Sequence, residues 1–289
     1  MVKYLLVLQL LLTAISAQSQ ILHDSILVEG HQRTFHFLKP AKPKASLVFV
    51  LHGSGGDGQQ MRERAQKLEA IAPAENILLV YPDGYKRFWN ECRRLAKSEA
   101  NLQNINENDF FGGMIDYFKQ KHGINDKQVF VVGTSGGGHM AYKLALTMPE
   151  RFTAITALIA NLPDTNNIDC IEKRITRPVM IVNGTEDKTN PYEGGEVILG
   201  NAGSFGFVRS TNRTFHYWSD LAGYKGEPKK ELLLDNDPKD GKTIERYTFK
   251  NEGKPEVTLL KVIGGKHDYP NDIDVHLEAW AFFKRCMEK

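Results

Sequence analysis

The sequence lacks the features that mark a metalloprotein, a nucleic-acid-binding protein or an integral membrane protein. It holds three cysteines among 289 residues and has no C-x-x-C, no H-E-x-x-H and no clustered His/Cys set, so we expect no metal site. The net charge is +2 and the basic residues are scattered, which gives no reason to expect a nucleic-acid partner. No stretch after residue 17 has the length and apolar character of a transmembrane helix, so we expect no integral membrane span.

The first 17 residues have the composition of a signal peptide. Lys3 supplies a positive charge, residues 4–15 are mostly Leu, Val and Ala, and small residues suited to cleavage stand at positions 14, 16 and 17. We therefore expect a secreted or periplasmic protein that begins near Gln18. A retained N-terminal anchor is the lesser alternative. In an oxidising compartment, three cysteines allow one disulfide and one free thiol.

The remaining chain alternates short apolar runs with helical patterns. Continuous β-branched and aromatic runs predict strands that are buried on both faces, and they occur at 46–51, 77–80, 129–132, 152–160, 178–182 and 257–263. Further strands are predicted at 25–28, 33–38, 231–234 and 243–249. Helices are predicted at 59–72, stopped by Pro73, at 110–121, capped by Asp109, at 209–222, and along a closing amphipathic segment from Ile273.

This alternation predicts an α/β fold with a mostly parallel, doubly wound central sheet and helices on both faces. We find no internal repeat, low-complexity tract or linker. The length suits one large α/β domain, so we expect residues 18–289 to form a single domain.

The segment from Val129 to Met140 combines a buried strand, a sharp turn and the start of a helix. Within it, residues 133–137 read Gly-Thr-Ser-Gly-Gly, which fits G-x-S-x-G. Glycines on both sides of Ser135 leave room for a strained turn that exposes the hydroxyl above the sheet. The amide of Gly136 would then face a developing oxyanion at a helix N-terminus. An ordinary glycine-rich turn is the alternative interpretation.

Candidate partners for Ser135 follow two later strands. Asp187 lies in the loop after 178–182, where Glu186 is its nearest rival and a solvated turn carboxylate is the alternative. His267 lies in the loop after the last buried strand, in the position of a general base. The chain order is Ser, Asp, His, which favours an acyl-transfer triad. Asp268 is too close to His267 in sequence to orient it.

A glycine-rich loop, residues 52–58, follows the strand 46–51 directly. We expect the amide of Ser54 to be the second oxyanion donor. A phosphate-binding loop is the alternative, but no Gly-Lys-Ser/Thr follows.

Side chains near the carboxyl ends of strands are candidates for substrate contact, because ligands bind at that edge of an open α/β sheet. Trp89 could instead anchor its loop on the core, and the two interpretations are equally supported. The candidate substrate-binding residues are Trp89, Tyr85, His139, Tyr192 and Tyr269.

Taken together, the motifs resemble those of the secreted α/β-hydrolase esterases of the polyhydroxybutyrate-depolymerase and feruloyl-esterase type, grouped with carbohydrate esterase family one. The matching motifs, found in order between residues 24 and 286, are Leu-His-Gly-Ser-Gly-Gly at 51–56, Val-Tyr-Pro-Asp-Gly at 80–84 followed by Trp89-Asn90, the elbow with Gly-His-Met-Ala-Tyr at 138–142, Leu162-Pro163, Asn-Gly-Thr-Glu-Asp at 183–187, the Asp-Pro…Asp-Gly turn at 237–241 and Gly-Gly-Lys-His at 264–267.

The resemblance implies an α/β-hydrolase fold with Ser135 as nucleophile, His267 as base, Asp187 as orienting acid and oxyanion donors near Ser54 and Gly136. It also implies that Cys92 pairs with Cys170 and that Cys286 stays free. The chain departs from the family at three places. It has Gly136 where Asn usually follows the nucleophile, and Asn183 where His often precedes the glycine of the acid loop. Around the base it reads Lys-His-Asp-Tyr-Pro at 266–270 where the family usually has Gly-His-Thr-Trp-Pro. These departures bear on the substrate.

We therefore expect a secreted serine esterase that needs no cofactor and acts on feruloyl or acetyl esters of plant polysaccharide. The alternatives are a polyhydroxyalkanoate depolymerase, a generalist short-chain esterase, a peptidase and, from another class, a non-catalytic carbohydrate-binding relative. The sequence does not indicate the oligomeric state.

Overall fold

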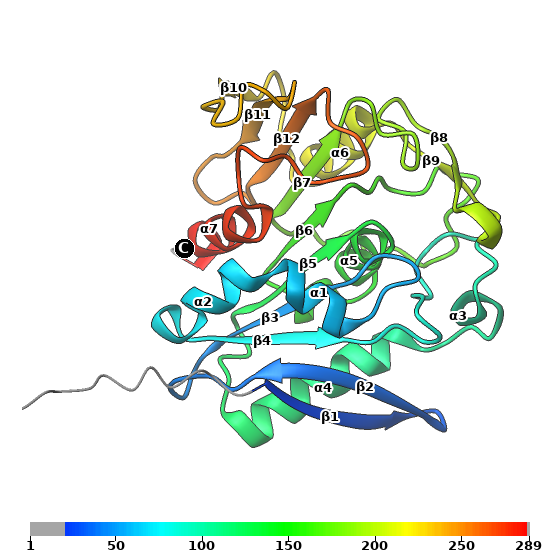
Figure 1. Cartoon of the computed structure of the whole chain (residues 1–289), viewed down its shortest axis with the longest axis vertical. Coiled ribbons are helices and arrows are strands. Elements are labelled where there is room, and N and C mark those ends of the chain that lie inside the picture. The colour runs from blue at the N-terminus through cyan, green and yellow to red at the C-terminus, as the bar shows by residue number, and fades with distance from the viewer. Residues whose placement is uncertain (1–20, 288–289) are drawn as a thin grey trace, which may run out of the picture.

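Residues 21–287 are described by the computed structural model, and they fold around one large twisted sheet (Figure 1). The predicted signal peptide, residues 1–17, lies outside the described residues. Within residues 21–287 this sheet has ten strands in the order β1-β2-β4-β3-β5-β6-β7-β12-β11-β10. The strands are β1 (Ile21–Val28), β2 (His31–Leu38), β3 (Ser46–Leu51), β4 (Ile77–Pro82), β5 (Val129–Thr134), β6 (Ala154–Leu158), β7 (Val179–Gly184), β10 (Lys229–Leu232), β11 (Thr243–Phe249) and β12 (Val257–Ile263).

The centre of the sheet is parallel and its two edges are antiparallel. The six adjacent strands β4, β3, β5, β6, β7 and β12 run parallel to one another. Two antiparallel strands flank this centre on each side. Every residue of β3, β4, β5 and β7 is buried, as continuous apolar runs predict for strands covered on both faces.

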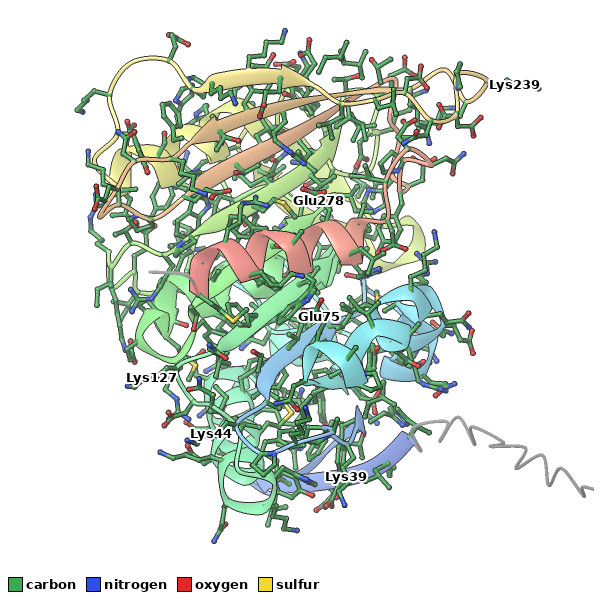
Figure 2. All side chains as sticks on the ribbon, turned by 90° about the vertical axis from the view of Figure 1, so that its left-hand side faces the viewer. Lys39, Lys44, Glu75, Lys127, Lys239 and Glu278 are labelled. Carbon is green, nitrogen blue, oxygen red and sulfur yellow. A yellow bond between two sulfur atoms is a disulfide. The ribbon has the colours of Figure 1, made fainter. Side chains whose placement is uncertain are left out.

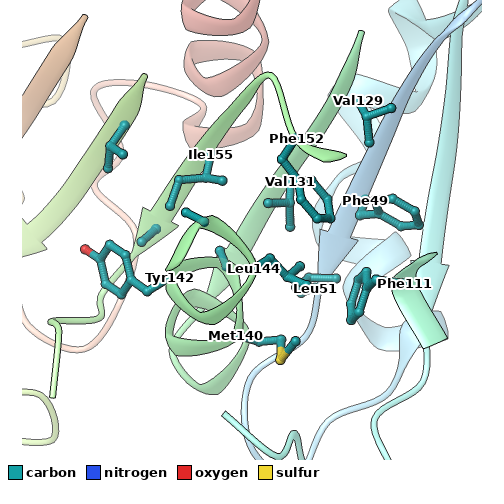
Figure 3. Close-up of a cluster of buried hydrophobic side chains, with 14 of the residues drawn as sticks. Phe49, Leu51, Phe111, Val129, Val131, Met140, Tyr142, Leu144, Phe152 and Ile155 are labelled. Atoms are coloured by element: carbon teal, nitrogen blue, oxygen red, sulfur yellow. The ribbon is translucent and has the colours of Figure 1, made fainter. Parts of the chain in front are cut away.

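Helices cover both faces of the sheet. One face packs against α4 (Glu107–His122), α5 (Gly136–Thr147) and α6 (Thr211–Leu221), and the other against α1 (Gly58–Arg64), α2 (Gln66–Glu75) and α7 (Val275–Met287). Figure 3 shows Phe49 and Leu51 of β3 near Met140 and Leu144 of α5, and Figure 2 shows α7 lying across the opposite face. The predicted doubly wound architecture is therefore present.

Several local predictions differ from the structure in detail, among them the bounds of β1 and of β10, which lie at 21–28 and 229–232 instead of 25–28 and 231–234. Pro73 does not end a helix: α2 continues to Glu75 and ends at Asn76, which adopts the left-handed conformation with φ 52°. Asp109 does not cap α4, because the helix begins earlier and the side chain of Asn106 accepts from the Asp109 amide. The first hairpin turns over two residues with positive φ, Glu29 and Gly30, so β2 starts two residues before the predicted strand.

A second, two-stranded sheet was not predicted. It is formed by β8 (Gly195–Ile198) and β9 (Ser204–Val208). Its strands are short, and two of its apolar side chains, Ile198 and Phe207, are exposed, so the sequence shows no clear alternation. The hairpin packs on the segment 85–98 through a small cluster of Ala96, Val197, Phe205 and Val208.

Candidate active site

Ser135 occupies a strained turn between β5 and α5. Its backbone has φ 54° and ψ −115°, a left-handed φ that non-glycine residues rarely adopt. The turn is tight because a Cβ on Gly137 would lie 2.6 Å from the carbonyl oxygens of Leu51 and His52. The predicted elbow geometry is therefore found, and α5 begins directly behind the serine.

The three predicted triad residues form a hydrogen-bonded chain. His267 Nδ1 lies 2.7 Å from Asp187 Oδ2, and His267 Nε2 lies 3.0 Å from Ser135 Oγ. The other carboxylate oxygen of Asp187 accepts from the amides of Thr189 and Asn190, at 2.8 Å each. Because the Asp187 carboxylate can only accept a hydrogen bond, Nδ1 of His267 carries the proton and donates to it. Nε2 is then free to accept from the serine hydroxyl.

Close contact between the acid loop and the base loop brings Asp187 and His267 together. A Cβ on Gly184 would collide with the carbonyl of Gly265, and the Gly264 amide donates to Thr185 Oγ1 at 2.9 Å. The rival acid Glu186 is exposed. Asp268 is exposed too and pairs with Lys242 at 3.1 Å, so neither orients the imidazole.

The glycine-rich loop after β3 lies against the elbow. A Cβ built on Gly136 would lie 2.9 Å from the amide nitrogen of Ser54 and 2.5 Å from its hydroxyl. The two amides proposed as oxyanion donors are therefore close together, and the space that a side chain at position 136 would need is filled by Ser54.

A buried histidine holds this loop in place. His52 is 1% exposed, and burial lowers the pKa of its imidazole. Its Nε2 accepts from the Gly84 amide at 2.9 Å, so Nδ1 carries the proton and donates to the Gly53 carbonyl at 2.7 Å. The indole of Trp89 donates to the His52 carbonyl at 2.9 Å.

The pocket beside the triad has a volume of about 310 Å³. The side of α1 that faces the elbow contributes residues that the sequence analysis did not single out. The only sequence signal for Gln60, Met61 and Arg64 as lining residues is that α1 follows the glycine-rich loop directly. The lining residues are His52, Gly53, Ser54, Gly55, Gly56, Gln60, Met61, Arg64, Thr134, Ser135, Ile159 and His267.

None of the five candidate substrate-binding residues is among those lining residues. Trp89, His139 and Tyr192 are buried, with exposed fractions of 2%, 4% and 5%. For Trp89 the structure favours the alternative that it anchors its loop on the core. Tyr85 donates to Gln103 and packs on the ring of His31. Tyr269 shares a short hydrogen bond with the hydroxyl of Thr134, the residue before the serine.

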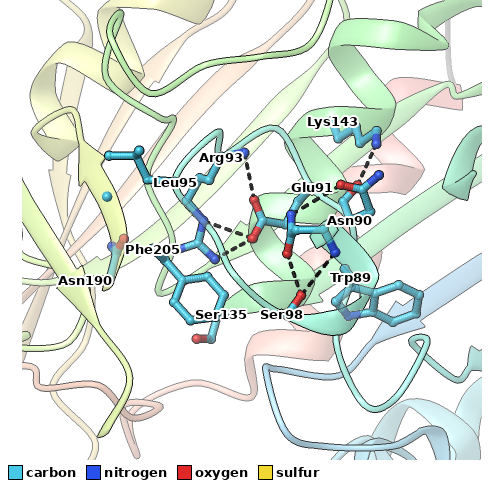
Figure 4. A network of polar contacts seen from close by, with 12 residues as sticks. Trp89, Asn90, Glu91, Arg93, Leu95, Ser98, Ser135, Lys143, Asn190 and Phe205 are labelled. Carbon is cyan, nitrogen blue, oxygen red and sulfur yellow. Dashed lines mark hydrogen bonds and ion pairs between the residues drawn. The ribbon is translucent and has the colours of Figure 1, made fainter. Parts of the chain in front are cut away.

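A buried ion pair supports the segment 85–98 (Figure 4). Glu91 and Arg93 are 2% and 1% exposed, and Arg93 Nη2 lies 2.7 Å from Glu91 Oε1. The guanidinium also lies 4.8 Å from the ring centroid of Phe205 on β9. Burial lowers the pKa of His139 well below its ordinary value, and the charge of Arg93 lowers it further. The side chain of His139, one helical turn after Ser135, is therefore neutral.

A disulfide joins Cys92 in this segment to Cys170, and Cys286 forms no disulfide. Nearby, Lys143 of α5 donates to the Asn90 carbonyl at 2.5 Å. Burial lowers the pKa of its ammonium group, and the charges of Glu107 and Glu91 oppose this effect.

Within residues 21–287 no group of three or more His, Cys, Asp or Glu side chains is arranged to hold a metal ion. The same residues contain no helix with the length and apolar character needed to cross a bilayer.

Comparison with known proteins places this geometry among ester hydrolases. The sequence profile of the family described as Phospholipase/Carboxylesterase matches residues 33–200, more than half of the chain. NocK of Nocardia uniformis subsp. tsuyamanensis, named as a candidate esterase, is 26% identical over 258 residues, which are 85% of this chain and 73% of that protein.

Two acetylxylan esterases are also similar. The bifunctional acetylxylan esterase/xylanase XynS20E of Neocallimastix patriciarum is 23% identical over 205 residues, or 70% of this chain, but the chain spans only 27% of that protein. The structure of the acetyl xylan esterase from Aspergillus awamori matches with a TM-score of 0.60 and 16% identity, over 91% of this chain and 99% of that one. At that identity the likeness concerns the fold, and it confirms the predicted α/β-hydrolase architecture.

Proposed function

Because the chain belongs to the phospholipase/carboxylesterase family of α/β-hydrolases, we propose that it removes acetyl or other small acyl groups from carbohydrate esters through Ser135, His267 and Asp187. Ester hydrolysis itself follows from the family and from the esterases among its relatives. The observation that carries the assignment of residues is the hydrogen-bonded chain from the Ser135 hydroxyl through His267 to the buried Asp187 carboxylate.

In the proposed reaction the Ser135 oxygen attacks the ester carbonyl while His267 Nε2 accepts the hydroxyl proton. Asp187 keeps the proton of the imidazole on Nδ1 and stabilises the imidazolium that forms. The amides of Ser54 and Gly136 stabilise the oxyanion, each by about 3 kcal/mol in the transition state. His267 then protonates the leaving alcohol. In the second half of the reaction water attacks the acyl-enzyme while His267 Nε2 accepts its proton, and His267 returns that proton to the Ser135 oxygen as the carboxylic acid leaves. No cofactor is required.

The composition of the pocket supports a small acyl group over a feruloyl group. Its lining consists of glycines, Ser and Thr side chains, Gln60, Met61, Arg64 and Ile159, and among the described lining residues the only ring systems belong to His52 and His267. An aromatic acyl group gains much of its binding energy by packing against other rings. Acetylxylan esterases and a feruloyl esterase both occur among the relatives, so the choice of a small acyl group rests on the pocket lining. A generalist short-chain esterase remains the alternative within the same chemistry.

Secretion is part of the proposal. The disulfide between Cys92 and Cys170 fits an oxidising compartment, and a polysaccharide substrate would be met outside the cell. We further propose that residues 18–289 act as one catalytic domain.

The test compares acetylated xylan, methyl ferulate and a short hydroxybutyrate oligomer as substrates of the wild-type enzyme and three variants. Ser135→Ala and Asp187→Asn are expected to lower kcat for the acetyl ester by about four orders of magnitude. The matched control is Glu186→Gln, which changes the exposed neighbouring carboxylate and is expected to stay close to wild type. If Ser135→Ala kept the kcat of the wild-type enzyme, the assignment of Ser135 as the nucleophile would be refuted. A preference for methyl ferulate would refute the small acyl group.

A further inference from the structure

The first helix after the glycine-rich loop presents two long polar side chains to the candidate active site. Gln60 and Arg64 are four residues apart on α1 and therefore share one face of the helix. Both line the pocket that contains the Ser135 hydroxyl and the His267 imidazole. No step of the proposed reaction uses either side chain.

Arg64 is the only permanently charged residue among the twelve described residues that line this pocket, and none of the twelve is Asp or Glu. The two histidines in the lining are both engaged: His267 is held by Asp187, and His52 is buried, with both ring nitrogens hydrogen-bonded and its pKa lowered by burial. A partly enclosed space with one fixed positive charge and no carboxylate favours a negatively charged ligand.

In the part of the chain that the structure describes, no ion pair is formed by the guanidinium of Arg64. Its neighbours pair elsewhere, Arg62 with Glu69 at 3.0 Å and Lys67 with Asp274 at 3.9 Å. Within residues 21–287 no carboxylate lies within 4.0 Å of Arg64.

Two acids close to His267 in the sequence are also engaged. Asp268 is bound by Lys242 at 3.1 Å, and Asp274 accepts from the amides of His276 and Leu277 at the start of α7, at 3.0 Å each. A substrate anion in the pocket would therefore be the partner that Arg64 lacks.

The side chain of Arg64 lies near a neutral group. Its positive charge offsets part of the rise in the pKa of the Tyr269 phenol that burial causes. Tyr269 is in turn hydrogen-bonded to Thr134, next to the nucleophile. A neutral neighbour of this kind does not cancel the charge of Arg64.

We propose that Arg64, assisted by Gln60, selects ester substrates that carry a carboxylate. This inference rests on the proposed function, since the carboxylate must be bound while the ester carbonyl lies at Ser135. A planar guanidinium binds a carboxylate through two parallel hydrogen bonds, and the amide of Gln60 can donate a third. The carboxylate could belong to the acyl group or to the alcohol, for example to an acidic sugar beside the esterified one.

Two matched substrate pairs separate these sources. On the alcohol side, 4-acetoxybenzoate is compared with its neutral methyl ester, so the acetyl group is constant. On the acyl side, p-nitrophenyl hemiglutarate is compared with p-nitrophenyl valerate, so the leaving group is constant. The measured quantity is the ratio of kcat/KM for the anionic ester to that for its neutral partner, within each pair.

For one of the two pairs, Arg64→Gln is expected to lower this ratio about tenfold or more, mainly through KM of the anionic ester. Arg64→Lys should keep part of the preference, and Arg64→Glu should reverse it. Lys67→Gln is the matched control, because it removes the same charge from the neighbouring helix outside the pocket, and it should leave the ratio unchanged. The wild-type ratio should also fall as salt is added.

The inference is overturned if the ratio is the same in the wild type and in Arg64→Gln for both pairs, or if Lys67→Gln lowers it equally. The salt dependence of the wild-type ratio tests it even if a variant fails to fold: a ratio that does not change with salt counts against it. A different result would refute the proposed function itself: no hydrolysis of either neutral ester by the wild-type enzyme.

Discussion

At the scale of single residues, Gly136 and Ser54 must be considered together. The family to which the motifs were compared usually has Asn after the nucleophile, and this chain has glycine. The structure supplies the reason, because the hydroxyl and the amide of Ser54 occupy the space in which a Cβ at position 136 would lie. Both candidate oxyanion donors therefore depend on a glycine at this position.

We predict that Gly136→Ala lowers kcat by about a hundredfold, with a smaller change in KM. The added methyl group must push Ser54 aside, and loss of one oxyanion donor costs about that factor. Steady-state kinetics on a short acetyl ester provide the measurement. The control is Gly112→Ala on α4, where a Cβ would meet only Met148 at 3.6 Å. An unchanged kcat in Gly136→Ala would show that the Ser54 amide is not a donor.

Asn183 is a second residue whose departure from the family pattern has a structural reason. It lies buried at the end of β7, where its amide donates to Asn161 at 2.9 Å, to Thr211 at 2.9 Å and to the Ala160 carbonyl at 3.2 Å. Its side-chain oxygen accepts from the Ala160 amide at 3.0 Å. A fully bonded buried amide fixes the strand end four residues before Asp187.

At the scale of elements, the segment 85–98 and the β8–β9 hairpin form one side of the site region. They are joined by the stacked rings of Phe88 and Phe205 and by the guanidinium of Arg93 on Phe205. The disulfide from Cys92 to Cys170 ties this segment to the chain beyond β6, across 78 residues of sequence. A cross-link over so long a loop constrains the unfolded chain strongly.

We predict that reduction of this disulfide lowers the free energy of unfolding by about 2–4 kcal/mol. Urea unfolding with and without a reductant measures the change. A Cys286→Ser background serves as the control, because the reductant can then act only on the Cys92–Cys170 bond. If Cys92→Ser/Cys170→Ser is as stable as the oxidised protein, the bond contributes nothing to folding.

At the scale of the whole molecule, buried histidines on separate elements oppose protonation. Burial lowers the pKa of His52 after β3, of His139 on α5 and of His276 on α7, the last to about 4. For Nε2 of His276 there is no hydrogen-bond partner within residues 21–287. In the unfolded chain each of these groups would bind a proton near pH 6.5.

We predict that the protein loses stability as the pH falls from about 6.5 to about 4. In this range the unfolded chain binds protons that folded His276 refuses, so the free energy of unfolding decreases with falling pH and levels off below the folded pKa. His276 alone accounts for about 3 kcal/mol of this change. Urea unfolding at a series of pH values measures it, and His276→Phe should flatten the dependence. An NMR titration of His276 with a pKa near 6.5 would contradict the prediction.

The parts that could be predicted from the sequence are those that depend on neighbours along the chain. Apolar runs located the strands of the central sheet, and β11 and β12 were predicted to the residue. Glycines around Ser135 indicated the strained turn that the structure contains. The order of Ser135, Asp187 and His267, each in a loop after a buried strand, was enough to predict that they converge, because parallel strands end at one edge of the sheet.

The pocket wall was decided only by the tertiary structure. The aromatic side chains chosen as substrate contacts instead fill the core or bond to neighbouring loops, because large rings stabilise the fold most when they are buried. Part of the wall is formed by α1, whose side chains lie near Ser135 only because the helix packs on β3 and β4, and β3 is the neighbour of β5 in the sheet. No local sequence pattern determines which side chains of α1 lie beside Ser135. Gln60, Arg64 and Ile159 could therefore be recognised as lining the site only from the folded structure.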